Sequence, residues 1–150
     1  MALIRKGIAG LVDLGSLLAI CNFTLCLAAA QECSGAIADA LETVEQALQA
    51  NPHELVYRPE ILRLRGELRL KHGQIELAES DFREAIDLAR SMGAKAWELR
   101  ATTSLADMLA DHGRRDEARS MLADIYGWFT EGFDTADLKD AKLLLDELGK

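Results

Sequence analysis

One pattern occurs three times in the chain and constrains its fold more than any other feature. A glycine recurs at Gly35, Gly73 and Gly113, first 38 and then 40 residues apart. Each glycine follows a small residue by seven positions and precedes an alanine by five. The matched positions of the three copies are Ala28, Gly66 and Ala106, then Ala40, Ala78 and Ala118, then Val44, Phe82 and Leu122, and finally Ala47, Ala85 and Ile125. Self-similarity at this period predicts a stack of similar units that bury apolar faces against one another.

Each unit is predicted to be a pair of antiparallel helices. Apolar residues recur at the helical spacing on both sides of the glycines, and no run alternates with the period of two that a strand requires. The glycine turns the chain, and the small residues let two helices approach closely. We therefore expect an all-α fold of seven to eight antiparallel helices in a single domain over residues 1–150, with pairs at about 16–51, 54–92 and 94–130 and a capping helix at about 134–149.

This pattern resembles the tetratricopeptide repeat, whose usual period is 34 residues. The copies here are longer by about one helical turn. They also lack the tryptophan and tyrosine usual in the first helix and a closing proline. The resemblance implies a tetratricopeptide-like solenoid with longer helices.

The charge balance and the N-terminal segment restrict where such a chain can act. Its 17 basic and 25 acidic residues give a formal net charge of −8, which opposes nucleic-acid binding by the chain alone. The apolar stretch Ile8–Ala30 follows Arg5 and Lys6, as in a secretory signal or a membrane span. However, Ala28 opens the first repeat, so Leu17–Gln31 is predicted to be a helix buried between neighbours. We expect a cytoplasmic, uncleaved chain without a membrane partner, and an exported helical-repeat protein is the alternative.

Residues that could carry chemistry are few. Cys21, Cys26 and Cys33 have no metal-site spacing and are predicted to be reduced, buried thiols. His72 and His112 each precede a repeat glycine, where an imidazole can cap the negative end of a helix. No phosphate-binding or nucleophile motif occurs. The sequence thus predicts no catalytic residue, no metal and no cofactor.

Two further segments have alternative interpretations. One helix is distinctly basic, and we expect it to form ion pairs with acidic neighbours rather than to bind an acidic partner. Its basic residues are Arg58, Arg63, Arg65, Arg69 and Lys71, and the expected acidic neighbours are Glu42, Glu45, Glu76 and Glu79. The second segment, residues 126–138, holds four aromatic residues within eight positions. We expect these rings in the core; the alternative is an exposed contact patch.

Three stretches carry a resemblance to a larger family. Residues Pro59–Glu67, Gly93–Ala101 and Phe129–Leu138 are similar to the C-terminal region of bacterial signalling P-loop ATPases. These ATPases carry an N-terminal nucleotidyl (adenylate or guanylate) cyclase domain or a winged-helix transcriptional-regulator domain, followed by tetratricopeptide-like repeats. The resemblance implies a sensing and partner-binding arm. No counterpart of the cyclase, ATPase or winged-helix domain is present, so those activities do not transfer.

The sequence therefore predicts a non-enzymatic module that binds a protein or peptide partner along the first helices of the pairs. Such an array can also self-associate through its ends. The alternative is a regulatory fragment that controls a separately encoded nucleotidyl cyclase or ATPase. The predicted outward contact residues are Arg65, Arg69, Glu98, Arg100 and Asp107.

Overall fold

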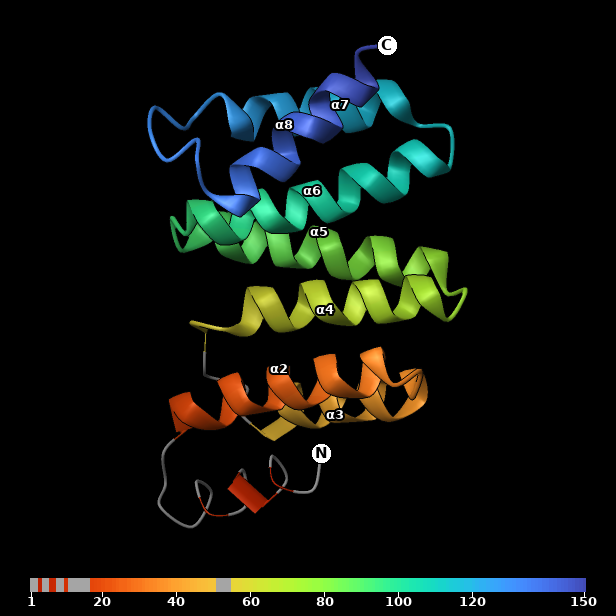
Figure 1. The fold of residues 1–150 in the computed structure, drawn as a ribbon, viewed down its shortest axis with the longest axis vertical. Coiled ribbons are helices and arrows are strands. Elements are labelled where there is room, and N and C mark those ends of the chain that lie inside the picture. The colour runs from red at the N-terminus through yellow and green to blue at the C-terminus, as the bar shows by residue number, and fades with distance from the viewer. Residues whose placement is uncertain (1–2, 4–5, 8–9, 11–16, 51–54) are drawn as a thin grey trace. The chain divides into compact units, whose positions relative to one another are not determined.

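The computed structural model describes residues 3, 6–7, 10, 17–50 and 55–150 (Figure 1). Of the N-terminal segment on which the signal-peptide alternative depends, residues 1–2, 4–5, 8–9 and 11–16 lie outside the described part. Within the described part the chain forms seven helices and no strand, which confirms the all-α class. The helices are α2 (Leu17–Cys33), α3 (Ile37–Ala50), α4 (Arg58–Lys71), α5 (Ile75–Ser91), α6 (Lys95–Asp111), α7 (Arg115–Tyr126) and α8 (Ala136–Leu148).

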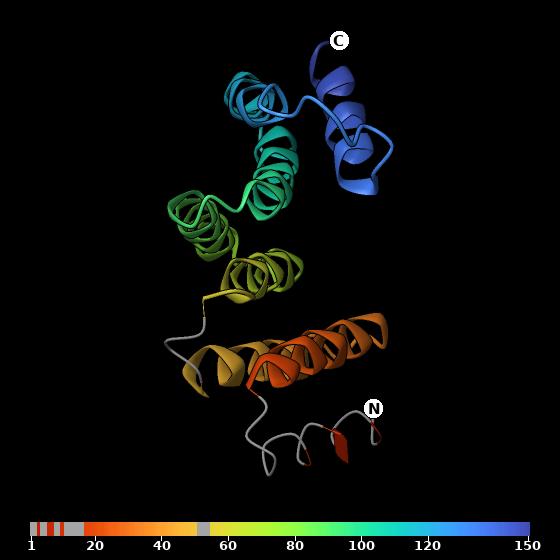
Figure 2. The same cartoon turned by 90° about the vertical axis from the view of Figure 1, so that its left-hand side faces the viewer.

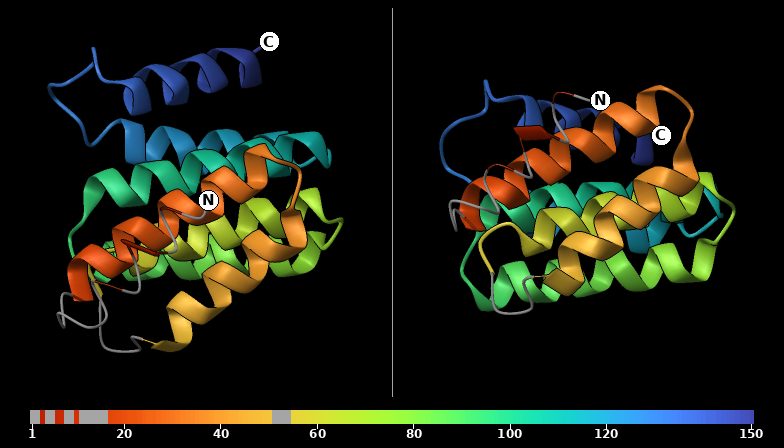
Figure 3. Two further views of the ribbon diagram at one scale, coloured as in Figure 1. Left: turned by 60° about the horizontal axis from the view of Figure 1, so that its bottom comes forward. Right: turned by 90° about the horizontal axis from the view of Figure 1, so that it is seen from below.

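The chain divides into two compact units, and the division falls inside α5 between Ala78 and Glu79. In the first unit, α2 and α3 lie side by side and are joined by a tight turn, and α3 also packs against α4 (Figures 2 and 3). In the second unit, α6 packs against α7, and α8 contacts both (Figures 1 and 2). In Figure 1, α8 runs obliquely to α7. The single domain over residues 1–150 stays a prediction.

The three repeat glycines end α2, α4 and α6 in the left-handed conformation. Their φ angles are 78° at Gly35, 80° at Gly73 and 80° at Gly113. Around Gly73, its own N–H donates to the carbonyl of Leu70, and the N–H of Gln74 donates to the carbonyl of Arg69. The same two hydrogen bonds form around the other two glycines, so each turn satisfies carbonyls left free at a helix end. The predicted role of the glycines is confirmed.

The remaining repeat positions are mostly buried. Ala40, Ala78 and Ala118 have no exposed surface. The large apolar residue that follows is buried in every copy, as Val44, Phe82 and Leu122. At the last position Ala85 and Ile125 are buried, whereas Ala47 is half-buried. Burying these side chains is the main source of stability expected for the helix pairs.

Local signals at two helix starts also match the predicted elements. Pro59 lies in the first turn of α4, where its missing N–H costs no hydrogen bond. Thr135 precedes α8 with extended backbone, and Asp137 lies in the first turn. The Thr135 hydroxyl donates to the carbonyl of Gly132 at 2.8 Å, so it braces the preceding loop instead of capping α8.

The exposed side of α2 differs from the prediction. Cys26 and Cys33, expected to be buried, are exposed, and the Phe23 side chain is 43% exposed. These residues share one face of α2, which no described helix covers, whereas Thr24, Leu27 and Ala28 are buried. The continuous apolarity of the segment therefore does not reflect burial on every side. Among the described residues, no helix is both long and apolar enough to cross a membrane.

Replacing Gly73 by alanine is expected to lower the free energy of unfolding by about 1–2 kcal/mol, because an L-residue pays this cost in the left-handed conformation. No atom lies within 4 Å of the added Cβ, so a clash does not contribute. Gly149→Ala is the matched control, since Gly149 ends α8 with a φ of −83°. Urea unfolding of both variants tests the turn. Equal free energies of unfolding for the two variants would contradict the predicted cost of replacing Gly73.

Candidate functional site

Two of the predicted contact residues, Arg65 and Arg69, lie on α4 and pair with the same carboxylate of α3. Arg69 Nη2 donates to Glu45 Oε1 at 3.0 Å, and Arg65 Nη1 lies 3.4 Å from Glu45 Oε2. The arginine side chains are only 17% and 14% exposed. The expected ion pairing of this basic helix is thus confirmed at Glu45, and both guanidinium groups already have a partner inside the first unit.

Two further basic residues of α4, Arg63 and Lys71, also pair with carboxylates. Arg63 donates to Glu60 at 2.8 Å and also pairs with Glu67, both on its own helix. Burial by itself lowers the pKa of the Arg63 guanidinium, but the hydrogen bonds and charges of Glu60 and Glu67 raise it overall. Lys71 pairs with Glu32 of α2, and this hydrogen bond raises the pKa of the Lys71 ammonium. The helix is therefore basic in sequence but largely compensated in the fold.

Glu98 is a correction to the predicted outward set. This residue is only 3% exposed, because α6 is buried over a broad face that also includes Leu99 and Thr102. Lys95 Nζ donates to Glu98 Oε2 at 2.7 Å, and Arg90 Nε donates to Oε1 at 3.1 Å. A buried carboxylate needs such partners to offset its lost hydration. Glu98 thus holds α6 to the end of α5 and does not offer a contact surface.

The last two predicted contact residues, Arg100 and Asp107, lie along α6. Arg100 Nε donates to Asp137 of α8 at 2.9 Å, and its guanidinium lies 5.2 Å from the centre of the Trp97 ring. Asp107 is exposed at the other end of the helix. Partial burial raises the pKa of its carboxyl, and the negative charges of Asp111 and Glu147 add to this effect. Arg65 and Arg69 belong to the first unit and these residues to the second, so they are described as two separate sets.

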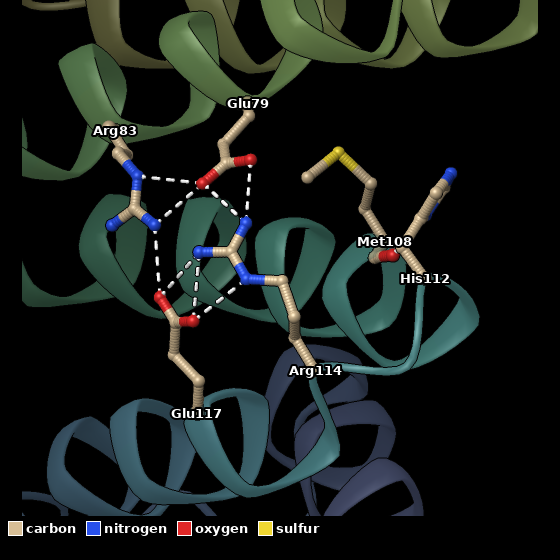
Figure 4. A network of polar contacts seen from close by, with 6 residues as sticks. All are labelled: Glu79, Arg83, Met108, His112, Arg114 and Glu117. Carbon is tan, nitrogen blue, oxygen red and sulfur yellow. Dashed lines mark hydrogen bonds and ion pairs between the residues drawn. The ribbon is translucent and has the colours of Figure 1, made fainter.

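A network of four charged side chains joins α5 to the start of α7 (Figure 4). Glu79 accepts from Arg83 at 2.7 Å, four residues along the same helix, and from Arg114 at 2.8 Å. Glu117 in turn accepts from Arg83 at 3.0 Å and from Arg114 at 2.8 Å. Each carboxylate therefore bridges both guanidinium groups.

This network was not predicted, because Glu79 was assigned to the arginines of α4. A signal for it does exist in the sequence. The pair Glu79 and Arg83 has helical spacing, and Arg114 follows Glu79 by 35 positions, close to the repeat period. Residues one repeat apart occupy neighbouring helix pairs, so opposite charges at that spacing can meet.

The electrostatics of the network favour a structural role. Hydrogen bonds from Arg83 and then from Arg114 lower the pKa of both the Glu79 and the Glu117 carboxyl. The carboxylates raise the pKa of Arg83 and Arg114 in return. Groups held in their charged forms in this way do not exchange protons near neutral pH. The network is suited to fixing helices rather than to acid–base chemistry.

The two repeat histidines lie at helix ends, as predicted. His72 ends α4 and His112 ends α6. The Nδ1–H of His112 donates to the carbonyl oxygen of Met108 at 2.7 Å (Figure 4). This carbonyl belongs to the last turn of α6, so the imidazole satisfies part of the helix end. In the described part of the chain, no three His, Cys, Asp or Glu side chains are grouped so that they could hold a metal ion.

The aromatic segment after α7 was expected to lie in the core, and this expectation is wrong for two of its four rings. Trp128 is 58% exposed and Phe133 is 47% exposed. Tyr126 and Phe129 are half-buried and hold the exposed rings in place. The centres of the Tyr126 and Phe133 rings lie 5.9 Å apart, and Phe129 meets Trp128 edge-on at 5.2 Å. Gly132 has a φ of 77°, outside helical geometry, so the loop can turn there and present rings outward.

No protein-family model matches the sequence, and no curated protein matches it either.

The network of Glu79 and Glu117 is expected to make stability depend on pH. Their carboxyl pKa values are lower in the folded chain than the ordinary 4.5, so their contribution is complete above about pH 4.5. That contribution is lost as the pH falls through the lowered values. A Glu79→Gln, Glu117→Gln variant should melt at a lower temperature at pH 7 and lose less stability between about pH 5 and pH 3.

Asp124→Asn, Asp140→Asn is the charge-matched control for this experiment, since both side chains are exposed and outside the network. Thermal unfolding followed by circular dichroism across this pH range makes the comparison. If the two double variants show the same pH dependence, the network does not contribute to stability.

Asp107 is expected to affect the pH dependence of stability in the opposite direction to Glu79 and Glu117. Its carboxyl pKa is higher in the folded chain than the ordinary 3.8, so ionisation destabilises the fold as the pH rises through the raised value. Asp107→Asn should therefore raise the melting temperature at pH 7, and the gain should disappear below about pH 4. Asp140→Asn serves as control. A melting temperature unchanged by Asp107→Asn would show that partial burial and the charges of Asp111 and Glu147 do not disfavour the ionised carboxyl.

Proposed function

We propose that the chain is a non-catalytic protein-binding module in which the helix pairs form a tetratricopeptide-like array. The observation that carries this proposal is the threefold recurrence of two successive helices joined at a left-handed glycine, with a buried alanine five positions later in each copy. Arrays of this kind present repeated helix surfaces to a partner helix or extended peptide. The three sequence stretches similar to the arm of bacterial signalling ATPases support the same role, in the cytoplasm and in signal transduction.

The contact set consists of Arg65, Arg69, Arg100 and Asp107. Glu98 is left out because its carboxylate is buried and holds two cations of its own chain. The three arginines are paired with Glu45 or Asp137, so an acidic partner group would replace one of these carboxylates rather than meet an unpaired charge. Such an exchange costs least at Arg100, whose pair with Asp137 is partly exposed, since an exposed ion pair contributes about 0–1 kcal/mol.

A double variant, Arg65→Gln with Arg100→Gln, is expected to lose partner binding severalfold while its melting temperature changes little. The Arg100 pair is partly exposed, and Glu45 keeps the closer Arg69 as a partner when Arg65 is replaced. Affinity capture from the native cells, followed by quantitative mass spectrometry, compares it with the wild-type chain. Calorimetry with the captured partner then measures the loss of affinity.

The control is a double variant that removes two positive charges outside the contact set. Arg119→Gln and Lys150→Gln are suitable because both side chains are exposed and neither is in the contact set. The proposal predicts a partner that the control retains and the Arg65, Arg100 variant loses. A partner captured equally by both variants would exclude this contact set, and a chain that captures no protein reproducibly would contradict the proposed function.

A further inference from the structure

The loop between α7 and α8 presents a surface that the proposed contact set does not include. We call it the aromatic loop surface, and it consists of Trp128, Glu131, Phe133 and Asp134. The loop projects past the ends of the two helices (Figures 1 and 3). Trp128 and Phe133 are among the most exposed large apolar side chains of the described chain, and they lie within one short loop. Exposed aromatic groups close together are typical of binding surfaces.

The exposed rings are held in a defined arrangement. Phe129 packs edge-on against Trp128, and Tyr126 packs against Phe133. Gly132 has a φ of +77°, and the Thr135 hydroxyl donates to its carbonyl, which fixes the turn between the two rings. A surface that is already ordered loses little conformational entropy when a partner binds.

The charges around these rings determine the chemistry of the partner. Lys95 lies 5.7 Å from the centre of the Trp128 ring, but its ammonium group is paired with Glu98. Glu131 and Asp134 are exposed, and neither forms an ion pair with any described residue. The nearby cation is thus compensated, whereas the two carboxylates of the loop are not. The aromatic loop surface therefore combines two exposed rings with two uncompensated carboxylates within residues 128–134.

We propose that the aromatic loop surface binds a basic, partly apolar segment of a partner protein. Lysine or arginine side chains of that segment pair with Glu131 and Asp134. Their aliphatic stems or a neighbouring apolar side chain cover Trp128 and Phe133, and a guanidinium group can also lie against the indole. An acidic segment is disfavoured by the uncompensated carboxylates, and so is a nucleic acid. The assignment is independent of Arg65, Arg69 and the other proposed contacts.

The test uses the full chain and a peptide of about ten residues that alternates arginine and leucine. A peptide with glutamate in place of arginine is the matched probe. Two-dimensional NMR follows the indole N–H signals of Trp128 and Trp97 separately. The arginine peptide should shift the Trp128 signal more than that of Trp97, with an affinity that falls as salt is raised to about 0.3 M. The glutamate peptide should leave both signals unchanged.

Variants separate specific binding from attraction to an acidic protein. Trp128→Ala and the pair Glu131→Gln, Asp134→Asn should each weaken binding of the arginine peptide about tenfold. Asp124→Asn with Asp140→Asn removes the same charge from other exposed positions and should leave the affinity unchanged. Circular dichroism checks that every variant keeps its helical content.

Three outcomes would overturn the proposal. The arginine peptide fails to bind, or it binds equally well to all of these variants, or the glutamate peptide binds with the same affinity. A fourth outcome would reassign the surface. If sedimentation shows a dimer of the wild-type chain that Trp128→Ala abolishes, the occupant is a second copy of this chain rather than a basic partner.

Discussion

The hydrogen bonds around each repeat glycine are the interaction on which the helix pairs depend. A left-handed residue at the end of α2, α4 and α6 reverses the chain within a few positions, and its two hydrogen bonds satisfy carbonyls that the helix leaves free. The alanine five positions after each glycine is fully buried in every copy. The larger apolar residue one turn further along is buried as well. Each turn therefore leads directly into the buried face of the next helix.

Much of this fold is predictable from the sequence, because glycine, alanine and the large apolar residue each have a distinct steric role. The repeat pattern predicts the all-α class, the positions of the turns and the burial of the repeat residues. The arrangement of α8 does not follow, since a single amphipathic helix can lie along or across its neighbours. The exposure of Cys26, Cys33 and Trp128 was missed for a similar reason. An apolar side chain is buried only if a neighbouring helix covers the helix face on which it lies. The spacing of apolar residues in the sequence does not show which face is covered.

Charged residues were the least predictable part of the candidate site. A charge on a helix was assumed to face solvent, yet Glu98 is buried because Arg90 and Lys95 neutralise it. Glu79 was assigned to α4 but pairs with Arg83 and Arg114. Ion pairs form between whichever long side chains the packing brings within reach, so their partners depend on helix register. In the structure most arginines are compensated, and the exposed, unpaired carboxylates of the α7–α8 loop remain available.

The central claim is that a helix, a left-handed glycine turn and a second helix recur three times in this chain. NMR backbone chemical shifts and amide couplings of the full chain measure this conformation directly at each glycine. The account predicts helical shifts on both sides of Gly35, Gly73 and Gly113, interrupted at each by a residue with positive φ. Helical shifts that continue through any of the three glycines, or extended shifts on either side of one, would contradict it.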